Sequence, residues 1–355
     1  MKPLIQLRSV CLVVALLLGG LSTQAASRPR YEIVDLGTIP GGGYPAQGTD
    51  INNSGQITAI ARGSNLFYRA CIYENGALRD LGIGTNGSGA QINDAGAMIG
   101  SFGTDWDTFT HGRDHAFMIT TGGIFTDLSV QFNRYVSPGG INNFGHIVGN
   151  AETDDGTSIV PFIYSNGVFQ LIPTPEVYFA DINDAGQILG TVTQLGPVPG
   201  DFAPRAAIYQ NGQVTLLARP RHSPESFGTR INEKGQVIGY ADDVNHFRRG
   251  FVWSKGHTRS VRPLHKDTVT FLYGINNLRV AVGYSRIPDE RVRAILWRNG
   301  KTHDLNRMIR KNSGWELNSA SAINDRGQIV GSGLFDGEYH AFLLNPIKRG
   351  HAPGY

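Results

Sequence analysis

The stretch INDAGQILG, residues 182–190, decides the fold because close copies of it recur along the chain. The copies begin their Ile-Asn pair at residues 51, 92, 141, 182, 231, 275 and 323, so the spacing is 41 to 49 residues. In each copy a tight-turn sequence such as Asn-Asp-Ala-Gly lies between two short apolar runs, as in a hairpin whose last turn residue is a left-handed glycine. A β-type repeat of this length predicts the blades of a propeller.

Each repeat contains four predicted strands, which we name a to d in chain order. Strand a ends at the Ile-Asn pair, and strand b is the following QIxG segment. Strand c ends in a glycine turn, as in RACIYENG (69–76), and strand d follows, as in ALRDLG (77–82). We predict that the repeated Asn and Asp residues form turns and cap their own backbone. They lack the alternating ligand pattern of an EF-hand calcium loop.

The two ends of the chain complement each other. The last repeat stops at HAFLLNP (340–346) without a strand d, whereas YEIVDLG (31–37) matches strand d but follows no strand a, b or c. We therefore predict an all-β fold, a single seven-bladed β-propeller of four-stranded blades over residues 31–346. The N-terminal strand 31–37 joins the last blade and closes the ring, which protects the otherwise exposed strand edges. Residues 347–355 are predicted to be a tail.

The first 25 residues are predicted to be a secretory signal peptide. Lys2 and Arg8 precede an apolar core (10–21) that is too short to span a bilayer comfortably. Small residues suited to cleavage follow the core. Cleavage removes these two charges and no acid, so the formal net charge falls from +3 to +1. We therefore expect no nucleic-acid partner. We expect a secreted monomer, periplasmic or extracellular, without membrane contact after cleavage.

The repeats also carry a family resemblance. The IN(D/N)xGQIVG segments, together with HAF at 115–117 and 340–342, resemble the HAF family of extracellular repeat proteins over residues 31–346. The resemblance implies a secreted bacterial protein, no established activity and no catalytic residues to transfer. Copies three to six depart from HAF and begin with Val160, Arg205, Arg249 and Arg293.

Six of the seven strands c open with a basic residue, at Arg69, His115, Arg205, Arg249, Arg293 and His340. Four of these bases have an Asp within reach on strand d, which predicts the cross-strand pairs Arg69–Asp80, His115–Asp127, Arg293–Asp304 and, across the ring closure, His340–Asp35. Arg205 and Arg249 lack such an Asp. The alternative interpretation of these bases is an anion-binding ring.

Variable segments indicate where a ligand would bind. The a–b and c–d turns are short and uniform and define one end of the propeller, the turn face. The b–c and d–a connections vary and define the opposite end, the loop face, where function is expected. These connections contain aromatic and charged residues that suit sugar rings or protein hot spots: Asp105, Trp106, Tyr135, Tyr178, His222 and Trp315. The structural alternative is that the aromatic side chains pack the loops onto the propeller.

The residue before each Ile-Asn pair is predicted to face the central channel. Asp50, Gln91, Asp181 and Arg230 occupy this position in four blades. Converging polar groups at a channel mouth are typical of a small-molecule site. If the protein is an enzyme, Asp50, Asp181 and Arg230 are the candidate catalytic residues, as in a hydrolase or lyase with paired carboxylates.

Other catalytic chemistry has little support in the sequence. It contains no serine-nucleophile elbow, no HExxH motif, no Walker loop and no histidine cluster with zinc spacing. Cys71 is the one cysteine outside the signal peptide and is typical of a small core residue rather than a nucleophile. We expect no metal and no cofactor. The leading hypothesis is a secreted, non-enzymatic binding module for a polysaccharide or a cell-surface protein, and the alternative is a carbohydrate-active hydrolase or lyase.

Overall fold

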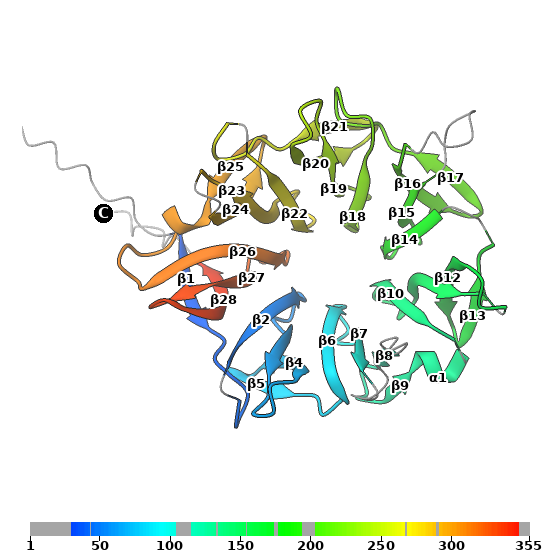
Figure 1. Ribbon diagram of the computed structural model, residues 1–355, viewed down its shortest axis with the longest axis horizontal. Helices are drawn as coiled ribbons and strands as arrows, with labels where there is room; N and C mark the ends of the chain where they lie inside the picture. Colours follow the sequence, from blue (N-terminus) through cyan, green and yellow to red (C-terminus); the bar gives the residue numbers. More distant parts are fainter. Residues whose placement is uncertain are drawn as a thin grey trace, which may run out of the picture.

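Seven four-stranded antiparallel sheets stand around a central axis in the computed structural model (Figure 1). The structure describes residues 30–42, 44–103, 115–132, 134–153, 155–173, 177–193, 203–266, 268–288 and 291–347. The first strand of each repeat is the innermost one, and the fourth lies at the rim. The prediction of a seven-bladed β-propeller is confirmed.

The first four blades follow the chain in order. Blade 1 contains β2 (Tyr44–Ile51), β3 (Ile57–Arg62), β4 (Tyr68–Glu74) and β5 (Ala77–Asp80). Blade 2 contains β6 (Thr85–Ile92), β7 (Met98–Gly103), β8 (His115–Ile119) and β9 (Phe125–Asp127), followed by the short helix α1 (Leu128–Phe132). Blade 3 contains β10 (Val136–Ile141), β11 (Ile147–Glu152), β12 (Ile159–Ser165) and β13 (Val168–Leu171). Blade 4 contains β14 (Val177–Ile182), β15 (Ile188–Val192), β16 (Arg205–Gln210) and β17 (Gln213–Leu216).

The last three blades complete the ring. Blade 5 contains β18 (Phe227–Ile231), β19 (Val237–Asp242), β20 (Arg248–Ser254) and β21 (His257–Ser260). Blade 6 contains β22 (Thr270–Ile275), β23 (Ala281–Arg286), β24 (Val292–Arg298) and β25 (Lys301–Asp304), followed by the 3-10 helix η1 (Leu305–Arg307). Blade 7 combines β26 (Trp315–Ile323), β27 (Ile329–Phe335) and β28 (Glu338–Pro346) with β1 (Tyr31–Asp35).

Ring closure follows the predicted arrangement. Strand β1 pairs antiparallel with β28, from Tyr31 opposite Pro346 to Asp35 opposite Phe342. Tyr31 and Ile33 pack against one side of blade 7, whereas Val34 packs with the core between blades 7 and 1. The N-terminal strand therefore supplies both the rim of the last blade and apolar contacts on each of its faces.

Each residue of the repeated motif has a structural task, which blade 5 illustrates. Asn232 Oδ1 accepts hydrogen bonds from the backbone N–H groups of Lys234 and Gln236 and thereby caps the a–b turn. Gly235 takes the left-handed conformation that the turn needs (φ 66°). Gln236 Oε1 accepts one N–H of the Asn232 amide, so this glutamine orients the asparagine. The predicted capping of the turns is confirmed.

The same asparagine side chains also join the blades, a role that the sequence analysis missed. Asn52 Nδ2 donates to the carbonyl oxygen of Asn93 in the next blade at 3.1 Å. The bond recurs at every blade boundary and returns to its start where Asn324 Nδ2 donates to the carbonyl oxygen of Asn52 at 3.0 Å. The closed Asn ring comprises Asn52, Asn93, Asn142, Asn183, Asn232, Asn276 and Asn324. All seven are at most 6% exposed, so each amide stabilises its own turn and its neighbour inside the protein.

A second ring lies one residue further along each turn. The backbone N–H of Asn53 donates to Asp94 Oδ1 at 2.8 Å, and each such side chain accepts from the preceding blade around the circle. The members of this second ring are Asn53, Asp94, Asn143, Asp184, Glu233, Asn277 and Asp325. The position requires a side-chain oxygen acceptor, which explains why it is always Asn, Asp or Glu.

The strand b glycine and the phenylalanine of the HAF-type segment fit each other. Gly149 pairs with Phe162, and a Cβ at Gly149 would lie 2.9 Å from the Phe162 ring. Blade 1 shows the complementary change, because Ala59 occupies the glycine position and faces Cys71 instead of a phenylalanine. The fully buried Cys71 therefore belongs to the core.

Three of the four predicted base–Asp pairs are present. His115 Nδ1 lies 2.7 Å from Asp127 Oδ2, His340 Nδ1 lies 2.8 Å from Asp35 Oδ2, and Arg69 is at 3.9 Å from Asp80. The Arg293–Asp304 prediction is wrong. Asp304 instead accepts from Asn306 at the start of η1, and Arg293 pairs with Glu316 at 2.9 Å. Arg249 does have a partner, since its Nε lies 3.1 Å from Asp243.

Deletion of residues 31–37 should destabilise the protein strongly, because blade 7 then loses its rim strand and the apolar contacts of Val34 and Leu36. We expect the melting temperature to fall by about 10 °C or more. Circular dichroism during heating measures this, and removal of residues 350–355 is the control. Unchanged melting of the 31–37 deletion would disprove closure by β1.

The substitution Asn142→Asp tests the Asn ring. Aspartate keeps the oxygen that accepts from Phe144 and His146, but it cannot donate to the Asn183 carbonyl oxygen. We expect the free energy of unfolding to fall by about 1–3 kcal/mol. Urea unfolding measures the change, with the exposed Asn245→Asp as the control. Equal stabilities of the two variants would contradict a stabilising role of the ring.

Candidate functional site

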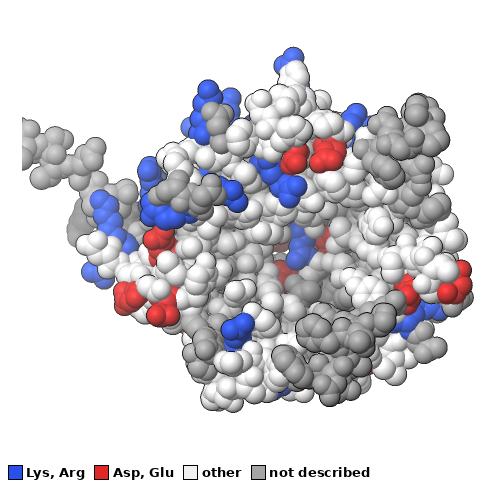
Figure 2. All heavy atoms as spheres, viewed as in Figure 1, with Lys and Arg blue, Asp and Glu red and all other residues white. Residues whose placement is uncertain are grey.

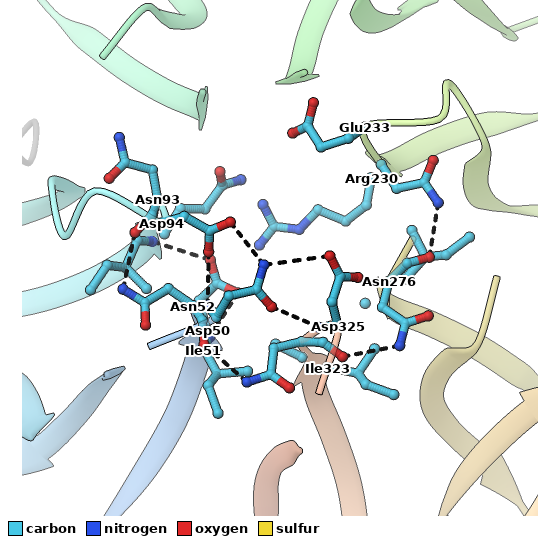
Figure 3. Close-up of a pocket in the computed structure, with 18 of the residues that line it drawn as sticks. Asp50, Ile51, Asn52, Asn93, Asp94, Arg230, Glu233, Asn276, Ile323 and Asp325 are labelled. Carbon is cyan, nitrogen blue, oxygen red and sulfur yellow. Dashed lines mark hydrogen bonds between the residues drawn. The ribbon is translucent and has the colours of Figure 1, made fainter. Parts of the chain in front are cut away.

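The central channel holds a polar cavity of about 160 Å³ near the turn face. Figure 2 shows the hollow at the centre of the ring, with acidic and basic side chains inside it. The ends of the seven innermost strands and the a–b turns line the cavity, so members of both hydrogen-bonded rings surround it (Figure 3). It is large enough for several water molecules or one small polar group.

A β-bulge in each innermost strand shapes this cavity. The pairing register shifts in all seven innermost strands two residues before the terminal isoleucine, for example between Phe179 and Asp181 and between Leu272 and Gly274. Bulges bend a strand and re-aim its side chains. The residue that follows the bulge lines the channel in six blades, as Asp50, Gln91, Asp181, Arg230, Gly274 and Ala322 do. The predicted channel position of Asp50, Gln91, Asp181 and Arg230 is confirmed.

Three of these side chains also bind the next blade. Asp50 Oδ2 accepts from the backbone N–H of Ile92 at 3.1 Å, and its Oδ1 accepts from Ile51. Gln91 Oε1 accepts from Ile141, and Asp181 Oδ2 accepts from Ile231 at 2.9 Å. The carboxylates of the channel are therefore already engaged as acceptors in the structure.

The two aspartates and Arg230 form one charged group in the cavity, whose lining also includes Asp94, Glu233 and Asp325. Arg230 reaches into the cavity, and its Nη1 lies 3.9 Å from Asp181 Oδ1 (Figure 3). Burial raises the pKa of the Asp181 carboxyl to about 6, an effect that nearby Arg230 opposes and the negative charge of Asp50 increases. Burial also raises the pKa of Asp50, again against the attraction of Arg230.

The loop-face candidates are spread over several blades. Tyr178 on β14 has 47% of its surface exposed, Tyr135 precedes β10 and is half-buried, and His222 is an exposed residue with a positive φ in the connection from blade 4 to blade 5. Trp315 opens β26 and stacks on Phe335 with ring centres 5.1 Å apart, so its ring packs blade 7. Asp105 and Trp106 lie outside the described residues.

Sequence reasoning missed a row of aromatic rings on blades 5 and 6. Ring centres are 4.9 Å apart for Phe227 and Tyr240, 4.8 Å for Tyr240 and Phe271, and 4.8 Å for Phe271 and Tyr273. Tyr284 joins the row through Phe271 and Tyr273. Tyr273 is 38% exposed and lines the channel cavity. The aromatic row, defined by these five residues, therefore begins at the channel and continues across two blades.

The same level of the channel differs on the other blades. Phe227 and Phe271 lie four residues before their terminal isoleucines, as the exposed Tyr178 does in blade 4. Blades 2, 3 and 7 carry serine there (Ser88, Ser137 and Ser319), and blade 1 carries Gln47. The innermost strands are thus aromatic on one side of the ring and small and polar on the other. The repeat alignment could have revealed this contrast, because all seven residues occupy one position.

Several other types of site find no support. In the part of the chain that the structure describes, no three His, Cys, Asp or Glu side chains are grouped so that they could hold a metal ion. Within the same ranges, no helix has the length and apolar character needed to cross a membrane. Burial and the charge of Asp80 raise the pKa of the Cys71 thiol to about 12, which disfavours a thiolate nucleophile.

The raised pKa of Asp181 makes the stability of the protein depend on pH. The folded protein holds this proton up to about pH 6, whereas the ordinary carboxyl pKa is 3.8. Proton binding by Asp181 therefore stabilises the folded protein fully below about pH 4, and this contribution is lost as the pH rises through 6. Relative to Asp181→Asn, we expect the wild type to lose about 3 kcal/mol of unfolding free energy between pH 4 and 7.

Urea unfolding at four pH values measures this difference. Asp184→Asn is the matched control, since asparagine already occupies the same turn position in three other blades. Parallel stability curves for wild type and Asp181→Asn would contradict the assignment.

No family model matches the chain, and no curated protein matches its sequence. Solved structures with a similar fold include the β-propeller domain of the Trilobed protease from Pyrococcus furiosus, with 12% identity and a TM-score of 0.54 over 72% of this chain and 80% of that chain. Virginiamycin B lyase from Staphylococcus aureus, solved as a catalytically inactive variant with quinupristin, has 11% identity and a TM-score of 0.51 over 89% and 100% of the two chains.

A third similar structure is the acylaminoacyl peptidase of Pyrococcus horikoshii, with 13% identity and a TM-score of 0.53. The match covers 80% of this chain and 50% of the peptidase, so this chain corresponds to about half the peptidase's length. At such low identities, these similarities show the propeller fold alone.

Proposed function

We propose that this protein is a secreted, non-enzymatic binding module that holds a polysaccharide at its central channel. The observation that carries the proposal is the contrast between aromatic and serine residues on the innermost strands. Exposed aromatic faces stack against the apolar faces of sugar rings, while hydroxyl groups exchange hydrogen bonds with the sugar. Tyr178 and Tyr273 offer exposed rings on blades 4 and 6, and Ser88, Ser137 and Ser319 offer hydroxyl groups on the innermost strands of blades 2, 3 and 7.

The hydrogen bonds of the channel carboxylates favour binding over catalysis. Both oxygens of Asp50 accept backbone N–H groups, and Asp181 accepts one as well. A nucleophile or general base in a glycosidase needs a carboxylate that is free to approach the sugar. The aspartates instead fix adjacent blades, which is a structural use of the same side chains.

A hydrolase at the same channel is the second candidate, and one observation favours it. The Asp181 carboxyl, with its pKa of about 6, is half protonated near pH 6 and could serve as a general acid in mildly acidic solution. In that case Asp50, Asp181 and Arg230 would be the catalytic residues. Under either function, we propose export by the N-terminal 25 residues, in keeping with the resemblance to the HAF family.

Binding and cleavage can be separated in one experiment. The chain from residue 26 is incubated with soluble and insoluble polysaccharides, and retention and polymer length are recorded in the same samples. We expect retention without shortening. Shortened polymers whose production requires Asp181 would establish the hydrolase instead. If the protein is retained on no polysaccharide but captures a surface protein, the ligand would be a protein and not a polysaccharide.

Tyr178→Ala and Tyr273→Ala test the aromatic residues. Each removes an exposed ring from the innermost strands, and we expect each to weaken polysaccharide binding about tenfold. Tyr339→Ala is the matched control, because Tyr339 is similarly exposed (54%) but belongs to β28, outside the innermost strands. Equal affinities of the three variants would refute the role of the aromatic residues.

A further inference from the structure

The basic residues of this protein are concentrated in one stretch of the chain. Residues 255–311 contain 13 Lys and Arg against 4 Asp and Glu, whereas the rest of the sequence contains 19 against 25. Three of the four acids, Asp267, Asp289 and Glu290, lie outside the described residues. We call residues 255–311 the basic sector. They form the rim of blade 5 and all of blade 6, and in Figure 2 blue side chains gather over this part of the ring.

The basic sector contains a cavity of about 620 Å³. Arg30, His265, Arg293, His303 and Arg307 line it, and Asp304 is the one carboxylate on its wall among the described residues. The lining comes from the d–a connection before blade 6, from strands β24 and β25, from η1 and from the residue that precedes β1. The basic cavity therefore lies on the loop-face half of blade 6, apart from the central channel.

Most cations of the basic cavity are incompletely neutralised. Among the described side chains, no carboxylate pairs with Arg30 or His265, and the 88% exposed Arg307 is 3.9 Å from Asp304. Arg293 is the exception, since it pairs with Glu316 at 2.9 Å. Burial and the positive charges of Arg30 and Lys301 lower the pKa of His303, which is consistent with a positive electrostatic potential in the cavity. A bound anion would relieve this repulsion.

The remaining wall of the basic cavity selects the kind of anion. Leu264, Ile287 and Met308 contribute apolar surface, and Thr302 and Asn306 contribute polar side chains. A cavity of this volume accommodates a ring-sized group rather than a bare ion. Guanidinium groups bind carboxylates and sulfates through paired N–H donors.

We infer that the basic cavity binds an acidic sugar residue, one that carries a carboxylate or a sulfate, of a polysaccharide. The inference rests on the proposed function and extends it, since the ligand becomes an anionic polysaccharide. The channel would hold uncharged parts of the polymer, and the basic cavity on blade 6 would hold its charged group.

Polymers that differ only in charge test the inference on the chain from residue 26. Polygalacturonate is compared with its methyl ester, and a sulfated galactan with its desulfated form, which separates carboxylate from sulfate. We expect at least one charged polymer to bind about tenfold more tightly than its neutral counterpart. The double variant Arg30→Ser/Arg307→Ser should lose this preference and keep its affinity for the neutral polymer. The matched control, Lys234→Ser/Arg326→Ser, removes two exposed cations from the turn face and should keep the preference.

The outcomes separate the two proposals. Equal binding of charged and neutral polymers would overturn the inference and leave the proposed function intact. If the control variant loses the preference for charged polymers equally, the preference reflects the overall charge of the protein, and the inference would again be overturned. Tighter binding of a short DNA duplex than of either acidic polymer would replace the ligand class with nucleic acid. Absence of binding to every polysaccharide would refute the proposed function itself.

Discussion

The Asn ring is the interaction on which the rest of this propeller depends. Seven buried amides each accept from their own turn and donate to a carbonyl oxygen of the next blade, so each a–b turn is shaped and connected by one side chain. Because the bonds form a closed circle, every blade has a neighbour on both sides. The β-bulges, the channel cavity and Arg230 are all located at the ends of the same seven innermost strands, next to the Asn ring.

The fold was predictable because its information is local. Turn sequences such as Asn-Asp-Ala-Gly and the unpaired strand at 31–37 fixed the strand number and the closure. The second role of Asn232 was not predictable from one repeat, since its partner is the carbonyl oxygen of Asn276 in the next blade. The Arg293–Asp304 pair failed for a similar reason, because η1 gave Asp304 another partner and the following blade supplied Glu316.

The candidate sites were only partly predictable. Counting back from Ile-Asn located Asp50, Asp181 and Arg230 in the channel, since their position is tied to the repeat. The aromatic row was not predicted from the sequence, because the contact between Tyr240 and Phe271 joins two different blades. The net charge did not reveal the basic sector, because it is summed over the whole chain. The 13 basic residues of this stretch are balanced by acidic residues elsewhere in the sequence.

The closing strand also determines the order of assembly. Strand β1 leaves the ribosome first, yet its partner β28 is synthesised more than 300 residues later. The ring therefore cannot close before β28 has been synthesised, and closure joins two segments that are far apart in the sequence, the kind of contact that forms slowly. Until then blade 7 has an open edge. A chain truncated before residue 338 would keep that edge, so only a chain that contains β28 can give β1 its partner.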